Sequence, residues 1–373
     1  MIIWYKCAVM KKRNIRVCLI APVPPPYGGI SNWTILVSHY ANKRNDLDIS
    51  IVNTAPRWRA IDDLSIWRRI IGGGIQLLRD YTKLLFNLKV KPDVIHLTTS
   101  GQLALFRDIV ILLTLKSMSI PCVFHIHFGR VPQMAKIDTF EWKMLSIATR
   151  LAHTVIALDE MTVSVINQLL PKVNVIKIPN GIDLDALPCH ISPYKQRTLV
   201  YLGWVIPTKG IEELCQAWKL LNLTEWRCLI VGPGSIEYKE KLRNHYSLNN
   251  LEFIAEQSHD EAMKILASSD VLVLPSYTEG FPNVIIEAMA LGKTIIASGV
   301  GAIPEMLSDE CGVVVPPHDI DALVLAIREV CMSEILRKKT GKRSQKKAKE
   351  EYSMYRIIEQ LMYTWDRVAG MQK

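Results

Sequence analysis

The stretch VLVLPSYTEGFPNVIIEAMALGKTIIA, residues 271–297, has the pattern of a strand, a loop, a helix and a second strand. Its first four residues are apolar and β-branched or leucine, which is typical of a buried strand. Pro282 suits the first turn of a helix, where its missing N–H is not needed. Another apolar run follows at 294–297. A strand, a crossover helix and a further strand predict a parallel sheet covered by helices.

The same alternation of apolar runs and helix-length segments extends in both directions from this stretch. It predicts two α/β domains, each a doubly wound, Rossmann-like unit, that face each other across a cleft. A length of 373 residues fits two such domains. The expected strands are 15–20, 49–53, 94–98, 121–126, 154–158 and 174–178, then 199–203, 227–231, 251–254, 271–274, 294–297 and 312–315.

The segment LPCHISPYKQ, residues 187–196, contains two prolines and lacks periodicity, so we interpret it as the linker. The domains expected on either side are 1–190 and 191–350. The amphipathic end, 351–373, is expected to form a helix that packs back toward the first domain. A ligand should lie in the cleft, outside the carboxyl ends of the strands.

Composition indicates a folded protein, with 49% apolar and 22% charged residues. The eight cysteines are scattered without CxxC pairs or metal-ligand spacing, so we expect reduced thiols in a cytoplasmic protein. The longest apolar run, 109–115, is much shorter than a membrane span. Residues 1–9 are apolar, but a basic cluster follows them and no cleavage site is evident, so we interpret them as an extension rather than a signal peptide.

Positive charge is concentrated in the first half of the chain. Residues 1–190 contain 23 Lys and Arg against 13 Asp and Glu, whereas the remainder is nearly neutral. Such a field favours an anionic partner such as a membrane surface or a pyrophosphate-linked lipid, although a solvated face without a partner would have the same composition. No motif or aromatic platform for reading nucleic acid accompanies the charge, so we expect no nucleic-acid partner. The Lys- and Arg-rich residues 335–350 are expected to form a solvated helix.

The main candidate ligand site lies where strand 271–274 meets the following helix. Glu279 and Gly280 occupy the loop, and the helix is expected to begin near Pro282 or Asn283. Free backbone amides at such a helix start favour an anion, which suits a diphosphate. Glu287 lies about one and a half turns further on, so the two carboxylates could meet different parts of one extended ligand.

These residues, set in EGFPNVIIEAMA, resemble the EX7E motif of the retaining GT-B glycosyltransferases of family four. The resemblance implies a nucleotide-diphosphate sugar as donor, for which UDP is favoured. It also implies that Glu279 contacts the donor sugar and Glu287 the ribose hydroxyls. The loop and helix start beside them, Gly280, Phe281, Pro282, Asn283 and Val284, are the corresponding donor-binding residues.

A second segment, YLGWVIPTKG at 201–210, resembles the family's Gly-Arg-x-x-x-x-Lys-Gly loop, whose Arg and Lys hold the donor pyrophosphate. Gly203 and Lys209 match this pattern, but Trp204 occupies the Arg position. An indole cannot replace the bidentate phosphate contact of a guanidinium group. Arg130 is a candidate substitute from the first domain, or else an ordinary surface arginine.

Two further segments of the first half match the family. In PPPYGGIS, 24–31, Gly28 and Gly29 would let backbone approach the diphosphate and the acceptor, although a simple turn is the alternative. In VFHIHFGR, 123–130, His127 ends an expected strand and matches the histidine that contacts the donor sugar. His125 lies on the same face but deeper, and we expect it in the core. We expect no zinc here because no third ligand accompanies the pair.

Additional candidates complete the site. Asn180 belongs to IPNGID (178–183), and Gly301 and Glu305 belong to VGAIPEML (300–307); both segments resemble family motifs. Gly301 and Glu305 would line the site, although a capped turn is the alternative. Ile254 ends the expected strand 251–254. The Asp-x-Asp triplets at 46–48, 183–185 and 319–321 fall at turns and helix starts, where Asp caps amides, so we assign no metal to them. No cofactor is expected beyond the nucleotide sugar as co-substrate.

The resemblance implies a metal-independent, retaining hexosyltransferase that uses a glycan or a lipid-pyrophosphate-linked saccharide as acceptor. Polysaccharide, O-antigen or lipopolysaccharide synthesis would be its setting. The alternatives are a sugar-nucleotide epimerase of the same architecture and a nucleotide-sugar-binding protein without turnover. The former would form product without an acceptor.

The segment SIWRRIIGGGIQLLRDYTKLLFNLK, residues 65–89, carries an apolar stripe interleaved with basic residues. This pattern is typical of a helix at a membrane interface, and it is equally typical of a helix that covers its own sheet. The interfacial interpretation would place the enzyme peripherally on the inner face of the cytoplasmic membrane.

Overall fold

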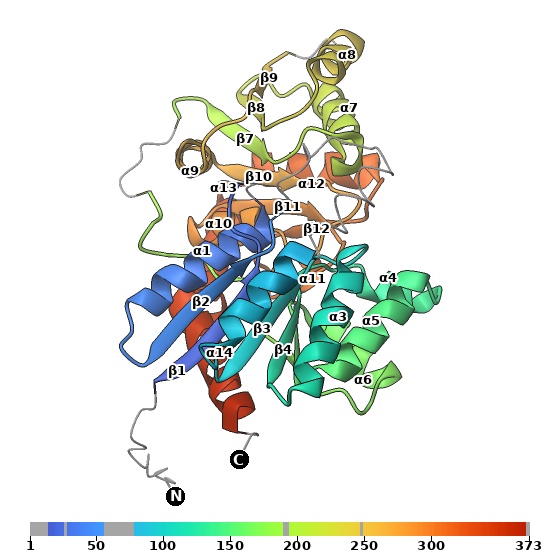
Figure 1. Ribbon diagram of the computed structural model, residues 1–373. Helices are drawn as coiled ribbons and strands as arrows, with labels where there is room; N and C mark the ends of the chain where they lie inside the picture. The colour runs from blue at the N-terminus through green and yellow to red at the C-terminus, as the bar shows by residue number, and fades with distance from the viewer. Residues whose placement is uncertain (1–13, 26–27, 56–77, 189–193, 247–248, 371–373) are drawn as a thin grey trace, which may run out of the picture.

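The computed structural model describes residues 14–25, 28–55, 78–188, 194–246 and 249–370. It contains two six-stranded parallel sheets in two Rossmann-like domains, one above the other in Figure 1, with helices packed on the sheets. This confirms the predicted fold class. The predicted N-terminal extension, the linker residues 189–193 and residues 65–77 of the interleaved segment lie outside the described residues.

The first sheet has β1 near one edge, with all strand pairs parallel. In spatial order its strands are β2 (Leu47–Asn53), β1 (Ile15–Ala21), β3 (Val94–Thr99), β4 (Cys122–Ile126), β5 (Thr154–Ala157) and β6 (Val175–Lys177). Its helices are α1 (Gly29–Asn42), α3 (Ala104–Ser117), α4 (Val131–Lys136), α5 (Phe140–Leu151) and α6 (Glu160–Leu169). Residues 78–88 are also helical.

The second sheet has the strand order of a dinucleotide-binding fold, in which the chain winds outward from a central strand in both directions. In spatial order its strands are β12 (Val313–Val315), β11 (Thr294–Ser298), β10 (Val271–Leu274), β7 (Arg197–Leu202), β8 (Trp226–Val231) and β9 (Leu251–Ile254). Its helices are η1 (Pro207–Lys209), α7 (Ile211–Leu221), α8 (Ile236–Tyr246), α9 (His259–Ser268), α10 (Asn283–Ala290), α11 (Ile303–Met306), α12 (Ile320–Met332) and α13 (Glu334–Glu351).

The burial of the central strands explains why apolar runs in the sequence predicted their positions. Every residue of β3, β4, β5, β10 and β11 is buried, as expected for parallel strands covered on both faces. Side-chain caps fix several helix starts: Asp159 accepts a hydrogen bond from the Thr162 amide at α6, and Asp319 accepts one from the Ala322 amide at α12. Asp319 therefore caps a helix, as the sequence predicted for this triplet.

The last helix, α14 (Met354–Gly370), crosses from the second domain and packs on the first. It lies beside β1 in Figure 1 and contacts α1, β1, β3 and β4. Ile357, Leu361 and Trp365 join the core formed by α1 and the sheet. The basic helix α13 precedes it, and most of its lysines and arginines are exposed or partly exposed.

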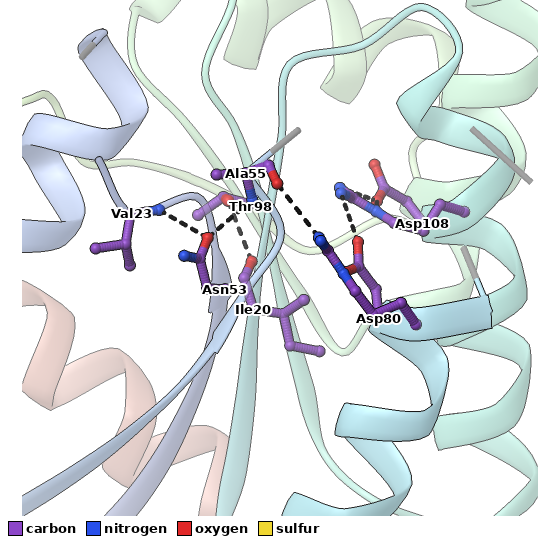
Figure 2. A network of polar contacts seen from close by, with 9 residues as sticks. Ile20, Val23, Asn53, Ala55, Asp80, Thr98 and Asp108 are labelled. Carbon is purple, nitrogen blue, oxygen red and sulfur yellow. Dashed lines mark hydrogen bonds and ion pairs between the residues drawn. The ribbon is translucent and has the colours of Figure 1, made fainter. Parts of the chain in front are cut away.

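A polar network closes the carboxyl edge of the first sheet (Figure 2). Asn53, at the end of β2, accepts hydrogen bonds from the amides of Val23 and Ala55. Thr98 donates its hydroxyl to the carbonyl of Ile20 and so ties β3 to β1. Arg79 pairs with buried Asp80 and donates to the carbonyl of Ala55, which anchors the helical residues 78–88 to this edge.

Candidate active site

Lys209 and Glu279 meet at the topological switch point of the second sheet. Lys209 ends η1, which follows β7, and Glu279 lies in the loop that follows β10, the neighbour of β7. Their Nζ and Oε1 atoms are 2.6 Å apart, and the side chains are 23% and 13% exposed. The fold thus places one cation and one carboxylate where an open α/β sheet binds ligands.

The start of α10 adds backbone donors to this position. Pro282 is the N-cap residue, and its side chain makes no capping hydrogen bond. Among the described residues no side chain accepts a hydrogen bond from the first-turn amides of Asn283 and Val284, so these amides can receive an anionic ligand. Burial raises the pKa of the Glu287 carboxyl, an effect that nearby His259 opposes. Glu287 lies on the same helix, about one turn beyond these amides.

Backbone from the two domains meets beside Glu279. A Cβ atom built on Gly129 of the first domain would lie 2.6 Å from the Cα of Gly280. Asn180 of the first domain donates its amide to Oδ1 of Asn283, at 3.0 Å. Gly301, at φ +56°, packs against the Glu279 carbonyl oxygen, 2.3 Å from where its own Cβ would be. The loop that carries Glu279 and Gly280 is therefore held by contacts from both domains.

Glu305 connects the domains at a second point. Its carboxylate accepts hydrogen bonds from the Glu160 amide, at the start of α6, and from Lys177 Nζ, at 2.8 and 2.7 Å. The sequence proposed Glu305 as a site-lining residue. The structure places its carboxylate in this interdomain ion pair.

His127 follows β4, and its ring lies 3.9 Å from that of His125, measured between centroids. Burial lowers the pKa of His127 to about 3, so the imidazole is neutral near pH 7. Its buried Nε2 has no hydrogen-bond partner among the described residues. A neutral imidazole with an unpaired nitrogen can contact a sugar hydroxyl as donor or acceptor.

Replacing His127 with Gln is expected to reduce the acid sensitivity of the fold. Because the folded pKa of about 3 lies below the ordinary 6.5, the unfolded chain binds a proton below pH 6.5 that the folded chain does not. Wild-type stability should fall as the pH drops, and this histidine should account for about 2 kcal/mol between pH 7.5 and 5. Urea unfolding at both pH values measures it. Equal losses in the variant and the wild type would contradict the assignment.

The other residues predicted for the site lie at or just beyond the ends of strands in the two sheets. Gly28 caps α1 and is exposed, as is Gly29. Gly203 follows β7, and Ile254 ends β9, where its carbonyl accepts a hydrogen bond from the Gly232 amide. Trp204 is 42% exposed, and its carbonyl accepts a hydrogen bond from the hydroxyl of Tyr201.

Arg130, the candidate phosphate ligand of the first domain, contacts residues of its own domain. Its guanidinium group is paired with Glu141, donates to the carbonyl of Ser100 and lies over the ring of Phe128. These partners all belong to the first domain, so the structure gives Arg130 a local role there. Its substitution for the arginine missing at position 204 stays a prediction.

The aromatic surroundings of His127 were not predicted from the sequence. Trp33 of α1 contacts the rings of His96, His125 and His127, and Trp365 of α14 donates to His96. A histidine inside the apolar strand run 94–98 was the available signal. In the part of the chain that the structure describes, no three His, Cys, Asp or Glu side chains are grouped as metal ligands. Within the same residues, no helix has the length and apolarity of a membrane span.

Two family models together span nearly the whole chain. The family described as Glycosyltransferase Family 4 matches residues 7–186, and that described as Glycosyl transferases group 1 matches residues 190–347. Their boundary coincides with the junction between the two sheets. The chain belongs to the GT-B glycosyltransferases that resemble family four.

Relatives of this GT-B glycosyltransferase agree with the assignment. The capsular polysaccharide biosynthesis glycosyltransferase CapM of Staphylococcus aureus is 26% identical over 237 residues, which cover 58% of this chain and 62% of CapM. The sulfoquinovosyl transferase SQD2 of Arabidopsis thaliana is also 26% identical, over 72% of this chain and 54% of SQD2. The chain therefore aligns with less than two thirds of the length of either relative.

Solved structures share the fold of this glycosyltransferase. A sucrose-phosphate synthase from Thermosynechococcus elongatus superposes with a TM-score of 0.75 at 18% identity, covering 96% of this chain and 100% of that structure. HepE of Anabaena, in complex with UDP-glucose, superposes with a TM-score of 0.69 at 16% identity, covering 94% and 100%. At these identities the likeness concerns the arrangement of the two domains.

Proposed function

We propose that this protein transfers a sugar from a nucleotide-diphosphate sugar, with UDP as the favoured nucleotide, to a glycan or lipid-linked saccharide. The observation that carries the proposal is the Lys209–Glu279 pair beside the uncapped start of α10. HepE, a protein of the same fold, was crystallised with UDP-glucose, which supports a UDP-sugar donor. CapM, named for capsular polysaccharide synthesis, supports a saccharide acceptor.

The chemistry requires stabilisation of the leaving diphosphate and of a positively charged sugar. Lys209 and the α10 amides would receive the diphosphate, a role that needs no metal ion. Glu279 would then exchange its contact with Lys209 for one with the donor sugar, and Glu287 would bind the ribose hydroxyls. His127 would contact a sugar hydroxyl through Nε2, once the groups that cover this buried nitrogen have moved.

We further propose that the anomeric configuration is retained. The leaving phosphate would take the proton of the acceptor hydroxyl as the new bond forms on the same face. The product anomer, determined by NMR, tests this step. An inverted product would refute retention while leaving the transfer itself intact.

A donor screen followed by an acceptor assay tests the proposed function. Thermal unfolding is measured with UDP-, GDP- and ADP-sugars, and the ligand that raises the midpoint most is the donor. That donor is then incubated with and without saccharide acceptors. Product that requires an acceptor supports transfer. Product without an acceptor indicates an epimerase, and a raised midpoint without any product indicates a binding protein.

Replacing Trp204 with Arg is expected to leave the fold intact and to keep or tighten donor binding. The side chain is 42% exposed, and the Tyr201 hydrogen bond uses the backbone carbonyl, which the substitution preserves. A guanidinium group here would restore the family's bidentate phosphate contact. Calorimetric titration with the donor measures the effect. A large loss of folded protein would show that the indole serves packing instead.

We propose that the acceptor is presented at an anionic membrane surface on the cytoplasmic side, against one face of the first domain. Part of the expected interfacial stripe serves the core instead, because Leu84 and Leu88 are buried. The exposed apolar side chains of this face come from three neighbouring elements. They are Leu78, Leu85 and Phe86 of helical residues 78–88, Phe106 and Leu113 of α3, and Phe140 of α5.

Contacts join these elements into one face, which we call the apolar face. The rings of Phe106 and Phe140 are 6.1 Å apart, and the hydroxyls of Tyr81 and Thr114 are 3.2 Å apart. Lys89 lies over the ring of Phe86, so cations accompany the apolar side chains. Exposed aromatic and basic groups together favour an anionic lipid interface.

Sedimentation with vesicles tests this proposal. The protein should sediment with anionic vesicles at low salt, less so at high salt, and not with neutral vesicles. Phe86→Ser and Phe140→Ser should each weaken sedimentation, because these rings are 68% and 66% exposed. Ile335→Ser is the matched control, since Ile335 is 82% exposed in the second domain. Protein that stays in the supernatant with both vesicle types would favour a soluble acceptor.

A further inference from the structure

A hydrogen-bonded series of aromatic side chains runs through the core of the first domain to the candidate site. The indole Nε1 of Trp365 donates to Nδ1 of His96, at 2.9 Å. The other nitrogen of His96, Nε2, is 3.1 Å from Nδ1 of His125. The ring of His125 in turn lies 3.9 Å from that of His127. Trp365, His96 and His125 are each completely buried.

The hydrogen bond from the indole determines which ring nitrogens of His96 and His125 carry a proton. An indole N–H only donates, so Nδ1 of His96 must accept and carries no proton. His96 is therefore neutral and protonated on Nε2, from which it donates to Nδ1 of His125. The proton of a neutral His125 then resides on Nε2. Burial lowers the pKa of both histidines, which agrees with two neutral rings.

We propose that Trp365 and His96 are positioning residues for His127, because they fix one tautomer and one orientation of His125, on which the His127 ring rests. This inference rests on the proposed function, in which His127 contacts the donor sugar. The ring of Trp33 contacts the same two rings, and its centroid lies 5.2 Å from that of His125 and 5.1 Å from that of His127. With His125 fixed on one side and Trp33 on another, the His127 ring has little freedom to turn.

The indole that begins this hydrogen-bonded series comes from the last helix of the chain. Trp365 belongs to α14, which reaches the first domain after the second domain is complete. His96 and His125 lie on the adjacent strands β3 and β4. The docking of the last helix therefore reaches a side chain at the candidate site through two hydrogen bonds and one ring contact.

The substitution Trp365→Phe tests the positioning role, because it keeps an aromatic ring in the core and removes the N–H. We expect kcat for transfer to fall about tenfold, the scale of one lost hydrogen bond, with KM for the donor changed less than about twofold. The ¹⁵N spectrum of the imidazoles, recorded without donor, should show one tautomer of His96 in the wild type and a mixture in the variant.

Matched variants separate positioning from core packing. Trp218→Phe is the control, because Trp218 is also buried and its indole donates to a backbone carbonyl, that of Asn249, in the second domain. It should leave kcat and the imidazole spectrum unchanged. His96→Gln keeps a side-chain donor toward His125 and should retain most of kcat, whereas His96→Leu should lower it like Trp365→Phe.

Three results would overturn the inference. They are an unchanged kcat in Trp365→Phe, an equal loss in Trp218→Phe, or a single His96 tautomer that persists without the indole. Failure of the proposed function is distinguishable from these. It would show as a wild-type protein that transfers no sugar although its donor-free spectrum contains the single His96 tautomer.

Discussion

Replacing Glu279 with Gln, or Lys209 with Ala, is expected to lower the rate of sugar transfer by at least about 100-fold while the protein stays folded. Removing one group that stabilises charge in a transition state has an effect of this size. Lys209 would neutralise the leaving diphosphate, and Glu279 would contact the sugar that separates from it. Initial rates at saturating donor measure the loss, and circular dichroism confirms the fold.

Lys209 and Glu279 form an ion pair with a 2.6 Å contact, so their role in binding the donor must be distinguished from a structural role. A pair that served structure alone would affect stability, whereas a pair that binds the donor should affect turnover more than the unfolding midpoint. Lys264 and Glu261 form the matched control, because they make an ion pair of 2.7 Å that is more than half exposed in the same domain. Lys264→Ala and Glu261→Gln should leave transfer unchanged. Near wild-type turnover in either Glu279→Gln or Lys209→Ala would refute the site.

The central strands of this protein were predictable because they are buried on both faces. Such strands are continuous apolar runs, and β10 and β11, on either side of the EX7E-like segment, are entirely buried. The order of the strands within each sheet is not visible in local sequence. The sequence analysis predicted no order, although crossovers of one hand and the few doubly wound topologies restrict it.

The candidate site was predictable where it depends on sequence neighbours, and not where it depends on the partner domain. Glu279, Gly280 and Asn283 lie within one loop and helix start, whose pattern indicates an anion site. The ion pair of Glu305 with Lys177 joins residues 128 positions apart, and it depends on how the domains pack. Trp365 lies 269 positions from His96, so local periodicity could assign it only to a buried helix face.

Replacing Gly129 with Ala is expected to reduce the rate of sugar transfer about 100-fold, although glycine has no side chain that could take part in the reaction. Its Cβ atom would lie 2.6 Å from the Cα of Gly280 and 3.1 Å from the carbonyl oxygens of Glu279 and Gly280, and these three backbone atoms cannot turn aside. The domains must then separate by about 1 Å, and a displacement of that size between reacting groups can cost about 100-fold in rate. His127, two residues before Gly129, would move away from Glu279, one residue before Gly280.

The substitution should change the relation between the domains more than the stability of either one. No cavity is created and no polar group is buried, so the unfolding midpoint should fall little compared with the rate. Gly370→Ala is the matched control, because nothing lies within 4 Å of a Cβ atom at that position. Initial rates and small-angle X-ray scattering of both variants measure the two effects. Wild-type turnover in Gly129→Ala would mean that the Gly129–Gly280 contact opens before transfer, and that His127 and Glu279 do not act on the same sugar across it.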